Sequence, residues 1–167
     1  MKKQLLVILA ALIMTTSAQA KTYLDVQGGL AFPQGNNSSL LSSPSYNAAV
    51  EIVIGMENLQ LGGFFQNYFY SLASPLSGTS STQFYGGVAR IGFVPTPIFA
   101  DAKVGLESST GSNVTVGFGV GLGWRFNLSP FTTLSPRVGY TFLPASYTGG
   151  TNSFSVIDTS LLLSIGF

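Results

Sequence analysis

Hydrophobic and polar residues alternate at every second position through most of the chain after residue 20. In residues 114–126 the even-numbered positions are large and apolar, whereas the odd-numbered ones are mainly glycine. Such a period of two indicates β-strands with two unlike faces, and no helical period competes with it. We predict eight strands, at Thr22–Phe32, Tyr46–Met56, Leu59–Tyr70, Phe84–Val94, Phe99–Glu107, Val114–Phe126, Thr132–Phe142 and Ser153–Phe167.

The connections between these strands alternate in length. Those at 57–58, 95–97 and 127–130 are short, whereas those at 33–45, 71–83, 108–113 and 143–152 are longer and polar. Short turns at one end and long loops at the other are typical of a transmembrane β-barrel, although a soluble meander could show the same alternation. Pro136 fits poorly, because proline cannot donate a ladder hydrogen bond. We expect either a bulge there or a strand that begins at about Arg137.

Most charged residues fall on the less apolar face of their strand, which we call the lumen set. Its members are Asp25, Glu51, Arg90, Asp101, Lys103, Glu107, Arg125, Arg137 and Asp158. Positive and negative charges in this set nearly balance. We therefore predict a structural network of ion pairs, since desolvated charges need partners. The alternative is a narrow or gated polar pore.

Composition indicates which face points inward. Charged residues make up 8% of the chain, against about 25% in ordinary globular proteins. A lipocalin-like soluble barrel would show a charged outer face, whereas the polar face here is rich in glycine, serine and threonine. Small residues suit the interior of an eight-stranded barrel, so we expect the bulky face to meet lipid. The predicted fold is an all-β, eight-stranded antiparallel up-and-down transmembrane β-barrel.

Aromatic residues gather near the two ends of the predicted strands. At the short-turn end these are Phe93, Phe99, Trp124, Phe126, Phe131 and Phe167. At the long-loop end they are Tyr68, Phe69, Tyr70, Phe84, Tyr85, Tyr140, Phe142 and Phe154. We interpret them as two girdles at the membrane interfaces. The glycine run 117–123 is expected to make room for large inward neighbours such as Phe64 or Tyr68.

Residues 1–20 have the features of a cleaved signal peptide. Lys2 and Lys3 precede an apolar stretch, and Ala18 and Ala20 occupy the positions that a signal peptidase accepts. A short membrane anchor is the alternative, but the stretch falls short of the roughly 20 residues that a spanning helix needs. The predicted domains are therefore the signal peptide, 1–20, and the barrel, 21–167.

Candidate chemistry is sparse. The chain has no cysteine and no histidine, which removes the usual zinc ligands and the ordinary hydrolytic triads. No catalytic set, cofactor site or metal site is expected, and an enzyme acting on membrane lipid would need an outward cluster that we cannot assemble. No basic run points to nucleic acid. The glycine run 117–123 lacks the spacing of a phosphate-binding loop.

The C-terminal strand resembles that of a known family. Apolar residues at every second position lead to a terminal phenylalanine: Leu161, Leu163, Ile165 and Phe167. This pattern is similar to the terminal strand of bacterial outer-membrane proteins, and the whole predicted barrel resembles the small OmpA-type and Ail/OmpX-type domains. The resemblance implies that these four residues are a signal for the barrel-assembly machinery. It also implies outer-membrane lipid as the surroundings.

These observations predict a bacterial outer-membrane scaffold that is not an enzyme. We expect its lumen to be filled by side chains and its four long loops to face the outside of the cell, where they could bind an extracellular ligand. Possible contact residues in these loops are Leu40, Leu41, Tyr46, Leu72 and Tyr147. A narrow channel for small solutes is the alternative function.

Overall fold

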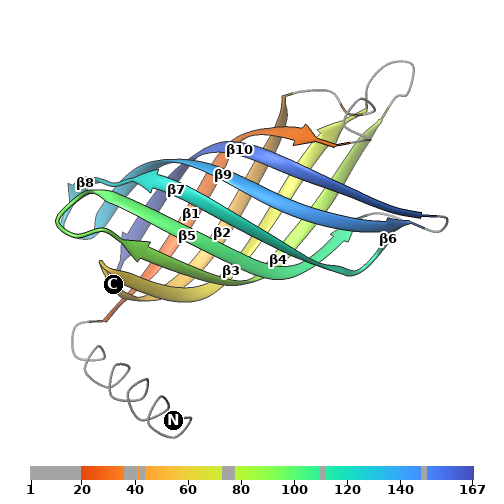
Figure 1. The fold of residues 1–167 in the computed structure, drawn as a ribbon. Helices are drawn as coiled ribbons and strands as arrows, with labels where there is room; N and C mark the ends of the chain where they lie inside the picture. Colours follow the sequence, from red (N-terminus) through yellow and green to blue (C-terminus); the bar gives the residue numbers. More distant parts are fainter. Residues whose placement is uncertain (1–19, 36–40, 42–43, 73–77, 110–111, 148–149) are drawn as a thin grey trace, which may run out of the picture.

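The computed structural model describes residues 20–35, 41, 44–72, 78–109, 112–147 and 150–167. The predicted signal peptide falls outside them except for Ala20. The described chain forms a closed antiparallel barrel whose strands are strongly tilted (Figure 1). Within these ranges, no helix is long and apolar enough to cross a membrane.

Each strand pairs with its neighbours in chain order. The strands are β1 (Lys21–Gln34), β2 (Ser45–Met56), β3 (Leu59–Ser71), β4 (Thr79–Gly92), β5 (Ile98–Ser109), β6 (Ser112–Asn113), β7 (Thr115–Trp124), β8 (Phe126–Ser129), β9 (Thr132–Tyr147) and β10 (Gly150–Gly166). The barrel closes because β10 pairs with β1 as well as with β9. The segments β6, β7 and β8 follow one another along β9 and together form the sixth wall. The prediction of an all-β, eight-stranded antiparallel barrel is confirmed, with β6, β7 and β8 counted together as one strand.

The predicted connection at 143–152 is wrong. Its residues continue β9 and β10, which stay in register as far as the pair Tyr147 and Gly150. The loop predicted at 71–83 is also shorter, because β4 begins at Thr79. Polar residues without alternation were interpreted as loop, but backbone hydrogen bonds between two strands do not depend on side-chain polarity. The pairing therefore continues beyond the apolar band.

Pro136 lies within β9, so both expectations for it are wrong. Opposite β10 the register runs without a shift through the pair of Pro136 and Leu161. On the other side the ladder stops at Gly123–Arg137 and resumes at Phe126–Leu134. The barrel accommodates the missing donor by leaving two residue pairs out of the ladder between the sixth wall and β9. The strand that holds the proline does not bulge.

The two faces of the strands point to different surroundings, as predicted. Along β2, Val50, Ile52 and Ile54 are exposed on the outer face, whereas Glu51 and Val53 between them are buried in the lumen. The girdle assignment is partly wrong. Phe93, Trp124 and Phe69 are exposed on the outside, but a group of four aromatic residues lies buried inside the barrel: Tyr68, Tyr70, Phe84 and Phe99. Position near a strand end was used as the criterion there, and it ignored the face on which each residue lies.

Candidate functional site in the barrel lumen

Arg90 forms the first centre of the lumen. Its Nη1 donates to Asp25 Oδ2 and its Nη2 to Glu51 Oε2, both at 2.7 Å. Strands β1, β2 and β4 bring the three residues together, and all three side chains are at most 3% exposed. Gln60 accepts a further bond from Nη1 at 3.1 Å. One guanidinium on β4 thus binds residues of three other strands, because its fork of donors can bind several acceptors at once.

Lys103 and Arg137 complete an ion-paired belt. Lys103 Nζ lies 2.7 Å from Glu51 Oε1, which links the lysine to the Arg90 centre through one shared carboxylate. Arg137 donates to both Asp101 oxygens at 2.7 Å and to Asp158 Oδ1 at 2.9 Å. We call these seven residues the ionic layer: Asp25, Glu51, Arg90, Asp101, Lys103, Arg137 and Asp158.

The other two members of the lumen set lie outside the ionic layer. Glu107 is fully buried and accepts hydrogen bonds from Ser109 and Thr115, at 2.7 and 2.6 Å. Arg125 is half-buried and donates from Nη1 to the backbone carbonyl of Glu57 at 2.7 Å. Among the described residues, neither side chain lies within ion-pair distance of an opposite charge. The balance of charge in the lumen set predicts that its charged residues form ion pairs. It does not show which residues pair with each other or which stay outside the pairs.

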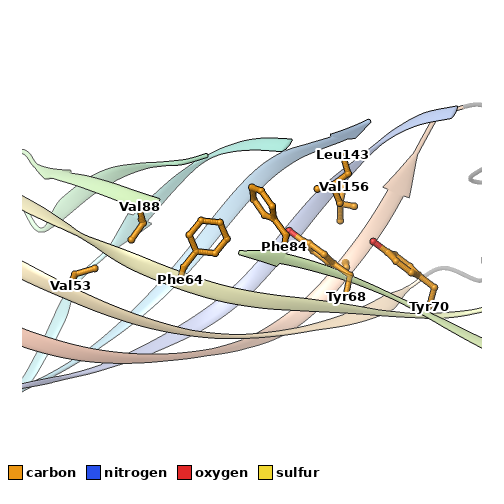
Figure 2. Close-up of a cluster of buried hydrophobic side chains, with 9 residues drawn as sticks. Val53, Phe64, Tyr68, Tyr70, Phe84, Val88, Leu143 and Val156 are labelled. Atoms are coloured by element: carbon orange, nitrogen blue, oxygen red, sulfur yellow. The ribbon is translucent and has the colours of Figure 1, made fainter. Parts of the chain in front are cut away.

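An aromatic layer occupies the lumen between the ionic layer and the long-loop end. Figure 2 shows its side chains following one another along the barrel. Phe64 and Phe84 make an edge-to-face contact, with ring centroids 4.7 Å apart, and Tyr68 donates to Thr141 Oγ1 at 3.0 Å. Lys103 Nζ lies 5.1 Å from the centroid of Phe64, so the two layers touch. The aromatic layer consists of Phe64, Tyr68, Tyr70, Phe84, Leu143 and Val156.

The glycine run of β7 leaves space for lumen side chains, but for other ones than expected. A Cβ at Gly121 would lie 2.3 Å from the Arg137 guanidinium, and one at Gly123 would lie 2.3 Å from the Phe99 ring. At Gly117 the nearest side chains are Leu143 and Phe84. The expected neighbours, Phe64 and Tyr68, are not among these closest contacts. Glycine at these positions lets a guanidinium and a ring lie directly against the backbone.

A cavity of about 440 Å³ lies at the short-turn end of the lumen. We call it the vestibule. Arg90 and Phe99 form part of its wall nearest the ionic layer, and the ring of Phe99 lies between two guanidiniums, with the Cζ atoms of Arg90 and Arg125 each 5.1 Å from its centroid. Exposed residues of the short connections, including Val94 and Phe131, also line the vestibule.

The residues of the C-terminal pattern all lie on the outer face. Leu161, Leu163 and Ile165 are partly exposed on β10, and Phe167 is 73% exposed just after it. The amide of Phe167 donates to the carbonyl of Thr22 at 2.8 Å, which ties the end of the chain to β1. The role of these residues in assembly stays a prediction. Within the described residues, no group of histidine, cysteine, aspartate and glutamate side chains could hold a metal ion.

No family model and no curated protein matches the chain. Among solved structures, it is similar to Neisserial surface protein A (NspA), with a TM-score of 0.72 over 89% of this chain and 99% of that one, at 15% identity. This chain has the fold of the small outer-membrane β-barrels. The barrel is also similar to Ail, the attachment invasion locus protein of Yersinia pestis, which was solved in complex with the heparin analogue sucrose octasulfate. There the TM-score is 0.52, at 10% identity, over 89% of this chain and 99% of that one.

Proposed function

We propose that this chain is a bacterial outer-membrane protein whose lumen is plugged by its own side chains and which serves as a scaffold for surface loops. The observation that carries the proposal is the succession of two buried layers across the lumen, one ionic and one aromatic. Six residues of the aromatic layer are at most 5% exposed, and so are the seven of the ionic layer. The proposal includes no enzymatic step.

The ionic layer supports a closed lumen because its side chains hold one another across the barrel. Arg137 binds residues of β5 and β10, whereas Arg90 binds residues of β1 and β2. Opening a path for ions would separate a buried charge from its partner. Separating such a pair typically costs about 3–5 kcal/mol, far above the thermal energy.

The outer surface supports a membrane location. Large apolar side chains are exposed on the outer face of most strands, for example Ile52, Val120 and Leu122 at 54–60%. A water-facing surface with so continuous an apolar band would associate or aggregate. By analogy with barrels of this kind, we assign the short connections to the periplasm and the long ones to the cell exterior.

The loops indicate what kind of partner they could bind. The four predicted long connections, 33–45, 71–83, 108–113 and 143–152, contain no aspartate, glutamate, lysine or arginine. A sulfated polyanion, which is recognised mainly through cationic side chains, is therefore a poor match. We expect a partner that is bound through hydroxyl, amide and apolar groups.

Of the five contact residues predicted in the loops, three have described side chains, and each has another contact or position. Leu41 and Leu72 form an isolated antiparallel bridge beside the neighbouring strands β2 and β3, and Leu41 packs against the buried hydrophobic cluster. Tyr46 is 63% exposed on the outer face of β2. Leu40 and the side chain of Tyr147 lie outside the described residues.

Single-channel recording tests the plug. Protein extracted from outer membranes is placed in planar bilayers, and its folding is checked by the gel shift between boiled and unboiled samples. We expect a silent barrel, with discrete conductance only in a variant that opens both layers, Phe64→Ala/Phe84→Ala/Arg90→Ala/Arg137→Ala. An Ile52→Ala variant, altered on the lipid face, is the matched control and should stay silent.

A narrow channel is the second candidate, because the vestibule brings solvent to the wall formed by Arg90 and Phe99. Steady openings of the unmodified protein that change when Arg90 or Arg137 is neutralised would establish the channel and overturn the plug. For the loops, whole-cell binding to immobilised host-surface material is compared between cells with and without residues 36–40. Equal binding would count against a role of the first loop in adhesion.

A further inference from the structure

The charges that line the vestibule do not balance. Lys21, Arg90 and Arg125 contribute side chains to its wall, whereas Glu57 is the one carboxylate among the lining residues. Arg90 is neutralised from behind by Asp25 and Glu51. The charges of Lys21 and Arg125 are left facing Glu57 alone, so the vestibule has an excess of positive charge.

Arg125 carries most of this excess inside the barrel. Its side chain is half-buried, its Nη1 donates to a backbone carbonyl, and its Nη2 has no hydrogen-bond partner among the described residues. Nearby, Ser135 is 1% exposed and its hydroxyl also lacks a partner within the described chain. A desolvated guanidinium and a hydroxyl without acceptors are together a favourable place for an oxyanion, since hydrogen bonds to charged groups are the stronger ones.

The rest of the vestibule wall combines apolar residues with polar ones, among them Gln60, Asn127 and Thr133. Val94, Phe131 and Leu162 line it from three different connections or strands, and the Phe99 ring forms part of the wall between the two guanidiniums. The volume of about 440 Å³ lies within the range of about 300–1,000 Å³ that is usual for small-molecule pockets. The apolar part of the wall gives a ligand with one anionic end a surface that its compact hydrophobic body can contact, whereas a fully hydrated inorganic ion would not use it.

We propose that the vestibule is a binding site for small amphipathic carboxylates that enter from the short-turn end. Arg125 holds the carboxylate, Ser135 donates to it, and the apolar wall around Phe131 contacts the hydrophobic body. The site goes beyond the scaffold role. It does not depend on whether the lumen conducts, because the ligand stops at the wall formed by Arg90 and Phe99.

The test is a titration of the ¹⁵N-labelled, membrane-extracted protein in nanodiscs of zwitterionic lipid, followed by NMR. The probes are benzoate, acetate, inorganic phosphate and benzyl alcohol. We expect benzoate to shift the signals of Phe131 and of the Arg125 side chain, and to bind about tenfold more tightly than acetate because its ring is buried. Benzyl alcohol of similar size but no charge, or phosphate, binding as well as benzoate would overturn the proposal.

Two variants change the net charge of the vestibule in opposite directions. Arg125→Gln should weaken benzoate binding about tenfold or more, because it removes the charged donor. Glu57→Gln should strengthen the binding, because it removes the one carboxylate of the wall. Thr79→Ala, at the far end of the barrel, is the neutral control. If Arg125→Gln fails to fold, Glu57→Gln and salt decide the matter: unchanged affinity in this variant, or affinity that does not fall with added salt, would contradict the site.

Discussion

The ionic and aromatic layers fill neighbouring parts of the same lumen by different physical means. In the ionic layer, three cations and four carboxylates are held by specific pairs at 2.7–2.9 Å, so each side chain depends on particular partners. In the aromatic layer, Phe64, Phe84 and their neighbours fill space by contact, and a neighbour can move to close a small gap. The comparison teaches that equal burial does not mean equal tolerance of substitution.

The largest effect is expected from breaking the ionic layer at Arg90. Arg90→Leu leaves the buried carboxylates of Asp25 and Glu51 without their shared cation. It should lower the free energy of unfolding by about 3–5 kcal/mol. Urea unfolding in lipid vesicles measures this change. Arg125→Leu is the control, because Arg125 is half-exposed and faces no ion-pair partner among the described residues; we expect about 1 kcal/mol there. Equal losses for the two variants would show that pairing in the ionic layer contributes little.

A change of shape in the aromatic layer should cost less. Phe84→Leu keeps an apolar side chain of moderate size next to Phe64 and Gly117. The loss should be about 1.5 kcal/mol, because the layer can partly repack. The same unfolding experiment checks it. A loss as large as that of Arg90→Leu would mean that the aromatic layer is as specific as the ionic one.

The hydrogen bond of Tyr68 in the aromatic layer sharpens the comparison further. Tyr68→Phe removes the hydrogen bond to Thr141 while keeping the ring, and the loss should be about 1 kcal/mol. Thr141→Val breaks the same bond from the other side. In the double variant the two losses should not add, and full additivity would show that the bond is not formed in the membrane.

The smallest effect is expected outside both layers. Glu57 lies in a short turn and is exposed. Glu57→Gln should change the free energy of unfolding by no more than about 0.5 kcal/mol. A larger change, measured in the same vesicles, would place part of the barrel's stability in its turns rather than in its lumen.

Sequence reasoning predicted the eight strands from local alternation, and the inward face of the charged residues from composition. It did not assign the partners within the lumen. Arg137 pairs with Asp101, which is 36 residues away, because closure of the barrel brings β5, β9 and β10 to one level. That level depends on the registers of several strand pairs at once, and no local pattern encodes it.

The errors have two different physical causes. Phe99 and Phe84 were assigned to the membrane girdles from their place near strand ends, but their face of the strand places them inside the barrel. Pro136 was expected to disturb its own strand, yet the neighbouring wall omits its rungs instead. For Pro136 the deciding factor is the relation between two strands, which a single strand's sequence does not contain, whereas the face of Phe84 and Phe99 follows from alternation within their own strands and was overlooked.

The hairpin of β9 and β10 is long enough to extend beyond the membrane. These strands have 16 and 17 residues, whereas a tilted strand crosses the hydrocarbon core with about 9–11. Some six surplus residues, at about 3.3 Å each and a tilt of about 45°, raise the hairpin tip roughly 14 Å above the apolar band. That is enough to clear the phospholipid headgroups. In the proposed orientation, with the long connections at the cell exterior, an antibody or phage could contact this hairpin above the membrane.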